Sequence, residues 1–433
     1  MDTTPYITQD TIVFGILMLT LGFVFYTSTS ETSHWKKFYK YIPALLMAYM
    51  MPAMFTTLGI IAPEWTTISE AGEITEHSSQ AYYVASRFLL PAALVLMTLS
   101  IDLKSVFNLG PKALIMFLTG TVGVIIGGPL AILLVSIVSP ETVGGAGFDA
   151  VWRGLATLAG SWIGGGANQA AMLEIYKFNT ANYASFVIVD IVVANIWMAI
   201  LLFGIGKSKK IDAWLKADTS AIEKLKEKVS SYAAQNVKNP TLADFMVILS
   251  IAFTVVGLSH FGANTISEFL KSNFEAVSDT SSAMSSFGSQ FFWMISIATI
   301  LGILLSFTKL KKYEGAGASK IGSVFIYILV ASIGMKMDLT KILDNPGLIV
   351  VGLIWMVIHV LLLIIMAKLI KAPYFFLAIG SKANIGGAAS APVVAAAFHP
   401  SLATVGVLLA VFGYVVGTYG AMLTAELMRI VAP

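Results

Sequence analysis

The feature that constrains this chain most is a series of about a dozen apolar runs, bounded by charged residues or proline. A helix rises 1.5 Å per residue, so about 20 residues cross the roughly 30 Å hydrocarbon core of a bilayer. The sequence therefore predicts an all-α integral membrane protein. The runs lie near residues 11–28, 41–62, 83–101, 112–138, 152–176, 182–206, 242–262, 288–308, 318–337, 346–370, 373–398 and 402–428.

The composition excludes several classes of function. Hydrophobic residues make up 57% of the chain and charged residues only 12%, about half the charged fraction of a soluble domain. The net charge is +3, and the basic residues sit in short loops without a contiguous basic track, so we expect no nucleic-acid partner. Cysteine is absent, which excludes disulfides, thiolate nucleophiles and thiolate metal sites. The expected partner of the apolar surface is the lipid bilayer.

One long polar segment, residues 207–241, divides the chain into a first membrane repeat at 1–206 and a second at 242–433. The segment interleaves eight lysines with acidic residues, and such basic stretches favour the cytoplasmic side of a membrane. We therefore expect a charged, partly helical cytoplasmic linker.

Loop charges also constrain how many runs cross the membrane. The shorter basic loops should be cytoplasmic, and the acidic loop at 63–80 should be external. If all twelve runs crossed once from an external N-terminus, the linker and the basic loop at 309–320 would both be external. Treating runs 152–176 and 373–398 as re-entrant places every basic loop inside. Each half then has five crossings and one re-entrant element, which makes the halves inverted in the membrane.

The same two runs contain glycine-rich sequences that are unfavourable in a continuous helix. The segments 160–171 and 380–392 share a Gly-Ser start, an Ile-Gly-Gly centre and a small-residue exit. A second similarity lies upstream of each glycine segment: residues 101–104 read Ile-Asp-Leu-Lys before Pro111, and residues 337–340 read Met-Asp-Leu-Thr before Pro346. The sequence therefore predicts two inverted structural repeats, each with about five transmembrane helices and one glycine-broken helix that is re-entrant or unwound.

Consecutive glycines at membrane depth can create a binding site for ions. Unwound backbone survives there only when it is buried in protein or lines a wet cavity, where its carbonyls can bind a cation and half-helix N-termini can bind an anion. The alternative is that small residues merely permit close helix packing. We favour a binding role and expect the solute at Gly165, Gly166, Gly386, Gly387, Ser381, Thr418 and Tyr419.

Polar side chains within the apolar runs are candidates for cation coupling, because they are costly there. Neutral amide and hydroxyl oxygens suit Na⁺, and the two glycine segments supply them at Asn168, Gln169, Ser381, Asn384 and Ser390. Asp190, with Asn195 five residues on, can hold a cation or carry a proton. The alternative for Asp190 is a structural carboxylate satisfied by a hydroxyl or by Arg87.

Two further titratable residues have simpler interpretations. His359 lies in an apolar run, and we expect it to bond a backbone carbonyl rather than relay protons. Arg87 begins a run after the acidic loop, and we expect its side chain to reach the membrane interface.

The second glycine segment, residues 380–392, continues into Ala395–Ala397 and then into Gly413-Tyr414 and residues 417–420, which read Gly-Thr-Tyr-Gly. With the first glycine segment, this pattern resembles the membrane family called domain of unknown function 819, of the YjcL type, over nearly the whole chain. The resemblance implies a relation to the bile-acid, arsenite and riboflavin transporter superfamily, whose core helices cross at unwound centres beside a panel of other helices. It also implies a bacterial inner-membrane location, and ions at the crossing, at Asn168, Gln169, Asn384 and Ser390. Several relatives carry an acidic residue in these segments, whereas this chain does not.

The expected function is a cation-coupled secondary transporter, driven by Na⁺ or H⁺, of a small organic, anionic solute. Alternating access would expose the site at the two broken helices. The alternative is a passive channel or facilitator. We expect no enzyme activity, since the sequence has no Gly-x-Ser-x-Gly, His-Glu-x-x-His or Walker motif. No cofactor is expected beyond Na⁺ as a coupling ion. The sequence is compatible with a homodimer and does not decide the oligomeric state.

Overall fold

The computed structural model describes residues 4–68, 74–99, 106–220, 239–278, 287–399 and 402–433, together with Ile222 and Leu225. All twelve predicted runs are helical within these ranges. The first-half helices are α1 (Asp10–Ser28), α2 (Ser33–Tyr41), α3 (Ala44–Thr57), α4 (Gln80–Val84), η1 (Ala85–Leu89), α5 (Leu90–Leu99), α7 (Pro111–Ser136), α8 (Pro140–Val143), η2 (Gly147–Asp149), α9 (Val151–Tyr176), η3 (Thr180–Asn182), α10 (Tyr183–Ile205) and α11 (Ser208–Leu215).

The second half contributes a similar series. Its helices are α13 (Leu242–Asn273), α14 (Glu275–Ser278), α15 (Gln290–Ser306), η5 (Lys309–Ala316), α16 (Ala318–Met335), η6 (Leu339–Leu343), α17 (Gly347–Leu369), α18 (Tyr374–Asn384), α19 (Gly387–Phe398) and α20 (Ala403–Val431). The repeated segment at residues 101–104 and part of the linker, residues 221, 223–224 and 226–238, lie outside the described residues.

Eight of the described helical segments are long and apolar enough to cross a membrane. They are α1, α4 to α5, α7, η3 to α10, α13, α16, α17 and α20. Two shorter helices, α15 and α3, have 17 and 14 residues. The protein is therefore a multi-pass helical membrane protein. The described ranges also contain one antiparallel strand pair, β1 (Glu64–Ile68) and β2 (Ile74–Ser78), in the acidic loop, which the hydropathy pattern does not predict.

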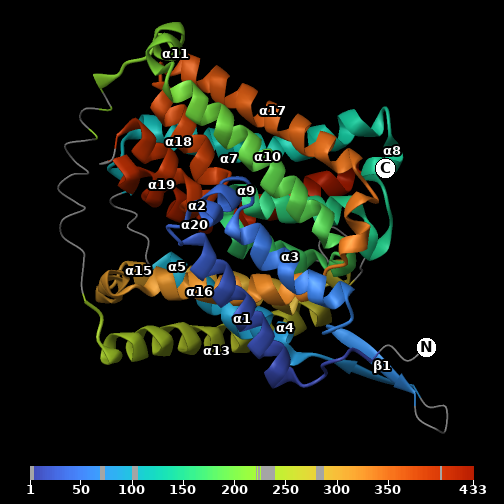
Figure 1. Cartoon of the computed structure of the whole chain (residues 1–433). Helices are drawn as coiled ribbons and strands as arrows, with labels where there is room; N and C mark the ends of the chain where they lie inside the picture. The colour runs from blue at the N-terminus through green and yellow to red at the C-terminus, as the bar shows by residue number, and fades with distance from the viewer. Residues whose placement is uncertain are drawn as a thin grey trace.

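The long helices form two bundles (Figure 1). The panel bundle consists of α1, α3, α5, α13, α15 and α16, which pack on one another. The hairpin bundle consists of α7, α9, α10, α17, α18, α19 and α20. Each bundle takes its helices from both halves of the chain, so neither half of the sequence folds into a bundle of its own.

Within the panel bundle, helices pair across the two halves. Helix α3 packs on α16, and α15 packs on α5. Glycine permits each approach: a side chain at Gly334 of α16 would strike the backbone of Tyr49, and one at Gly302 of α15 would strike Thr98. Helices α5 and α16 also pack on each other, as do α7 and α17 in the hairpin bundle.

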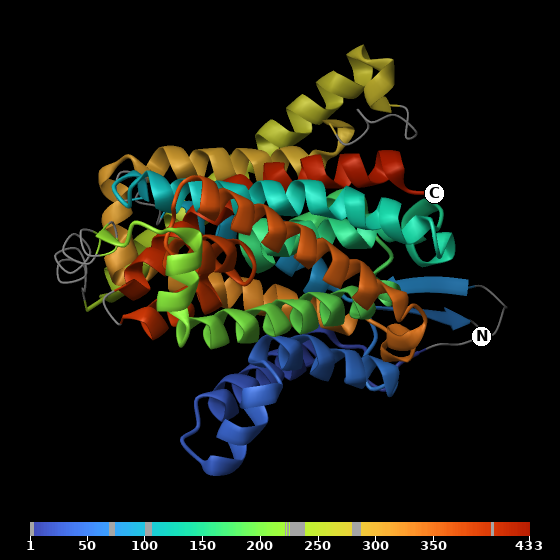
Figure 2. The same cartoon turned by 90° about the horizontal axis from the view of Figure 1, so that it is seen from above.

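The loops gather at two opposite ends (Figure 2). The β1–β2 pair lies at one end together with the C-terminus, and α11 lies at the other. There the linker begins by docking onto the membrane helices, since Asp218 Oδ2 accepts from Lys112 Nζ at 3.1 Å. Hydrogen bonds from Ser220, together with Lys112, lower the pKa of Asp218 to about 2. The positive-inside rule predicts that the α11 end faces the cytoplasm.

Candidate functional site: two glycine-broken hairpins

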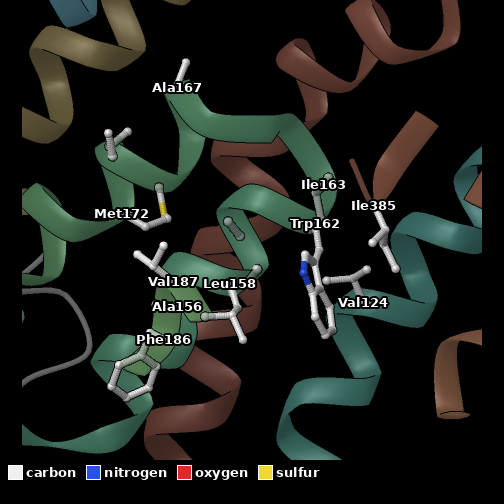
Figure 3. Close-up of a cluster of buried hydrophobic side chains, with 14 of the residues drawn as sticks. Val124, Ala156, Leu158, Trp162, Ile163, Ala167, Met172, Phe186, Val187 and Ile385 are labelled. Carbon is white, nitrogen blue, oxygen red and sulfur yellow. The ribbon is translucent and has the colours of Figure 1, made fainter. Parts of the chain in front are cut away.

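The first glycine segment folds α9 back on itself. A straight helix of 26 residues would separate its ends by about 37 Å, yet the Trp152 and Tyr176 rings lie 5.5 Å apart. The turn is at Gly165, with φ +73° and ψ −170°, values that only glycine adopts without strain. A side chain at Gly160 would meet the backbone carbonyl of Asn168 at 2.6 Å, so the two arms, residues 151–164 and 166–176, pack side by side (Figure 3).

The second glycine segment makes a second helical hairpin from α18 and α19. The rings of Tyr374 and Phe398, at its two ends, lie 5.8 Å apart. The turn contains Gly386 and Gly387, with φ +108° and +52°. The two runs predicted to be re-entrant, 152–176 and 373–398, are therefore both helical hairpins whose two ends lie close together. This is the geometry of a re-entrant element.

The two hairpins enter from opposite ends of α20. Near the start of α20, Gly406 lies against Ala391 of α19, where a Cβ would be 2.6 Å from its backbone carbon. Near the end of α20, the Tyr176 hydroxyl of α9 donates to the Met422 carbonyl at 3.3 Å and to Glu426. Helix α20 has 29 residues, so these two entry points are separated by most of its length.

The hairpin tips converge near the middle of α20, at Gly413. A Cβ there would lie 2.7 Å from the Ile163 carbonyl oxygen and 3.6 Å from that of Ala383. These carbonyls belong to the last turns of the two first arms, where carbonyl groups lack partners within their own helix. Two helix C-termini therefore meet at one point, which concentrates negative partial charge there.

Each hairpin has an asparagine that donates to the glycine carbonyl four residues earlier, Asn168 across the Gly165 turn and Asn384 within α18, before the turn. Asn168 Nδ2 donates to the Gly164 carbonyl at 2.9 Å, and Asn384 Nδ2 donates to the Gly380 carbonyl at 2.8 Å. Their amide oxygens each accept from a threonine hydroxyl, Thr418 for Asn168 and Thr121 for Asn384. All four side chains are buried. The asparagines thus stabilise the broken helices in this conformation, and their oxygens are engaged.

Asp190 of α10 binds both arms of the first hairpin. Its Oδ1 accepts from Trp162 Nε1 at 2.7 Å, and its Oδ2 accepts from Ser161 Oγ at 2.7 Å and Gln169 Nε2 at 3.1 Å. Ser161 and Trp162 belong to the first arm and Gln169 to the second. A carboxylate that accepts three hydrogen bonds suits the ionised form, which is acceptor-only. Asp190 is thus bonded by a hydroxyl, an indole and an amide. Arg87, the other expected partner, is not among its hydrogen-bond partners.

Ser381, the counterpart of Ser161, binds a different network. Its Oγ accepts from Trp197 Nε1 of α10 at 2.8 Å and lies 2.8 Å from His359 Nε2. His359 Nδ1 lies 2.9 Å from the Gly120 carbonyl, which can only accept, so this nitrogen carries the proton and Ser381 donates to Nε2. His359 therefore bonds a backbone carbonyl as expected, and it also positions Ser381.

A cavity of about 180 Å³ lies at the β1–β2 end of the molecule. Glu64, Tyr82, Arg87 and Lys336 contribute to its lining. Arg87 Nη1 pairs with Glu174 of α9 at 2.6 Å, and the Tyr82 hydroxyl donates to the same carboxylate. Arg87 thus does not simply extend to the membrane interface: it joins the panel bundle to the hairpin bundle. It sits in the π-helical turn η1, a distortion common at functional sites.

The remaining candidates are placed apart. Asn195 is exposed and its Nδ2 donates to the Ile191 carbonyl of its own helix at 2.8 Å. Tyr419 is 42% exposed, whereas its neighbour Thr418 is buried at Asn168. Gly165 and Gly166 are half-buried, near Tyr414 and Ile326 respectively. Ser390 Oγ lies against Gly386. The four residues proposed for Na⁺ therefore have four different sets of neighbours.

Two polar residues of the site were missed in the sequence. Lys382 is 2% exposed and donates from Nζ to the Ala194 carbonyl of α10 at 3.1 Å. An ionisable residue within an apolar run is by default a functional candidate, and this signal was present beside Ser381. Thr121 carried no comparable signal, because threonines are common in membrane helices, where the hydroxyl can bond a carbonyl of its own helix.

The sequence is similar to that of known membrane proteins over most of its length. It is 24% identical to the "Uncharacterized membrane protein YjcL" of Bacillus subtilis (strain 168) over 390 residues, which cover 87% of this chain and 88% of that protein. The family model described as "Protein of unknown function (DUF819)" matches residues 15–431. The chain, a multi-pass protein of the cell membrane, therefore belongs to the DUF819 family.

Proposed function

We propose that the protein is a cation-coupled secondary transporter of a small organic, anionic solute, with its site between the tips of the two hairpins. Na⁺ and H⁺ are the candidate coupling ions. Each hairpin would act as a gate for the face from which it enters, and the site would open to the two sides alternately.

The convergence of both first arms at Gly413 carries this proposal. The partial negative charge at two helix C-termini attracts a cation. The second arms begin at the same two turns, and their N-termini attract an anion. Binding a cation and an anion side by side lowers the cost of burying either one, which is the basis of coupled transport.

The packing of the panel bundle supports an inverted repeat. An approximate twofold axis that exchanged the halves would map the α3–α16 pair onto α15–α5, and would map the α5–α16 and α7–α17 pairs onto themselves. The same operation would exchange the two hairpins, α9 and α18–α19. Symmetry of this kind gives two gates of equal design, one for each face.

The direct test is uptake of ¹⁴C-labelled small organic acids into proteoliposomes. We expect accumulation of at least one acid under an imposed Na⁺ or H⁺ gradient, and none in protein-free liposomes or when the gradient is collapsed by an ionophore. Flux that reaches only equilibrium, at a rate independent of either gradient, would contradict coupling and favour a passive channel.

A further inference from the structure

The second hairpin holds a buried ammonium group whose hydrogen-bonding capacity is mostly unused. Lys382 is 2% exposed, and its Nζ donates to the Ala194 carbonyl at 3.1 Å. An ammonium has three N–H donors. Within the described ranges no carboxylate oxygen lies within 4.0 Å of Nζ, so two donors have no charged acceptor.

The nearest counter-charge is already occupied. Asp190 lies one turn before Ala194 on α10 and attracts Lys382 electrostatically, but its two oxygens accept from Ser161, Trp162 and Gln169. A buried charge without a close partner is costly. Lys382 therefore has no counter-ion in direct contact among the described residues.

The ammonium lies directly beneath an exposed turn. Gly386 is exposed, with φ +108°, and a Cβ at this position would be 3.0 Å from both Cε and Nζ of Lys382. The same Cβ would strike Ser390 Oγ. That hydroxyl is buried and has no hydrogen-bond partner. Helix α19 begins at Gly387, and no side chain caps it.

We infer that Lys382 and Ser390 form a carboxylate-binding subsite at the turn of the second hairpin. The carboxylate accepts from the Lys382 ammonium and from the Ser390 hydroxyl, which both lie next to Gly386. This inference rests on the proposed function, because it names the group by which the anionic solute is held. It assigns Ser390 to the solute rather than to the cation.

The charge of the site selects a monovalent group. Lys382 supplies one positive charge, and Asp190 already opposes it from the adjacent turn of α10. A dianionic phosphate would leave two uncompensated negative charges in a buried site, whereas a carboxylate leaves one, which a coupling cation can neutralise. The subsite is thus expected to bind acetate or lactate in preference to inorganic phosphate.

Thermal unfolding of the purified full-length protein in detergent tests the subsite without a gradient. Potassium acetate and potassium lactate are compared with acetamide and lactamide in potassium chloride of equal ionic strength, with inorganic phosphate in a parallel sample. We expect the carboxylates alone to raise the apparent Tm, by about 2 °C or more. The shift should vanish in Lys382→Met, shrink in Ser390→Ala, and persist in Lys368→Met, whose Nζ lies 4.6 Å from the centre of the Trp214 ring.

Equal shifts with the carboxylates and their amides would overturn the inference, and so would a larger shift with phosphate. A full shift in Ser390→Ala would also overturn it, and this variant decides the question if Lys382→Met fails to fold. The Tm assay measures binding at equilibrium and needs no gradient. The absence of a carboxylate-specific shift would therefore contradict the subsite without contradicting gradient-driven uptake. Equally, a lack of coupled uptake would not alter a carboxylate shift.

Discussion

Gly417→Ala is expected to lower both the stability of the protein and its transport rate, although it adds only one methyl group. The new Cβ would lie 2.5 Å from Gly164 Cα and 2.7 Å from Asn168 Nδ2. The first of these neighbours is backbone at the tip of the first hairpin and cannot rotate away. Overpacking of this kind costs about 1–3 kcal/mol, and it would also displace Asn168 from Thr418.

A control glycine separates this effect from helix propensity. At Gly257 in α13, an added Cβ would have no atom within 4 Å, so Gly257→Ala should be neutral or stabilising by up to about 1 kcal/mol. We expect the apparent Tm of Gly417→Ala to fall by about 1–3 °C and its uptake to fall at least about tenfold, since small displacements at a binding site have large effects. If the two variants behaved alike, close contact between α20 and the hairpin tip would not matter for function.

Asp190→Leu should be the most damaging single substitution in the hairpin bundle. It would leave the donors of Ser161, Trp162 and Gln169 buried without an acceptor, at about 1–3 kcal/mol each. The first hairpin would also lose the group that joins its two arms. We expect little folded protein, measured as the monodisperse fraction on size-exclusion chromatography in detergent.

Asp190→Asn separates the structural role from the coupling role. The amide keeps the shape and one acceptor oxygen, so we expect folded protein with a smaller loss of stability. It removes the negative charge opposite Lys382, and uptake should therefore lose or alter its dependence on the Na⁺ or H⁺ gradient. Asp338→Asn, in a loop where the side chain caps η6, serves as the control and should keep coupling. Unchanged coupling in Asp190→Asn would restrict Asp190 to joining the two arms.

The positions of the helices could be predicted from the sequence because length and hydrophobicity act locally. The parity of the basic loops also identified the two runs that do not simply cross. Both became hairpins because Gly165 and Gly386 adopt backbone angles that other residues avoid. These features are encoded in stretches of about 25 residues, so no knowledge of distant contacts was required.

The partners of the polar side chains could not be predicted in this way. Asp190 was expected to meet a hydroxyl or Arg87, but only the fold shows that Ser161 of α9 faces it while Arg87 pairs with Glu174. Nor does any local pattern bring Ile163 and Ala383 together at Gly413. These contacts join residues far apart in sequence, and they depend on how the two halves pack.

The accessibility of the four hairpin ends tests most directly whether the hairpins are re-entrant from opposite faces. The chain has no cysteine, so single cysteines at the exposed positions Ala146, Lys177, Lys371 and His399 can be labelled in intact cells with a membrane-impermeant maleimide. We expect Ala146→Cys and Lys177→Cys to react from outside, and Lys371→Cys and His399→Cys to react only after the membrane is permeabilised. If the two cysteines flanking either hairpin reacted from opposite sides, that hairpin would span the membrane, and the two-gate arrangement would be wrong.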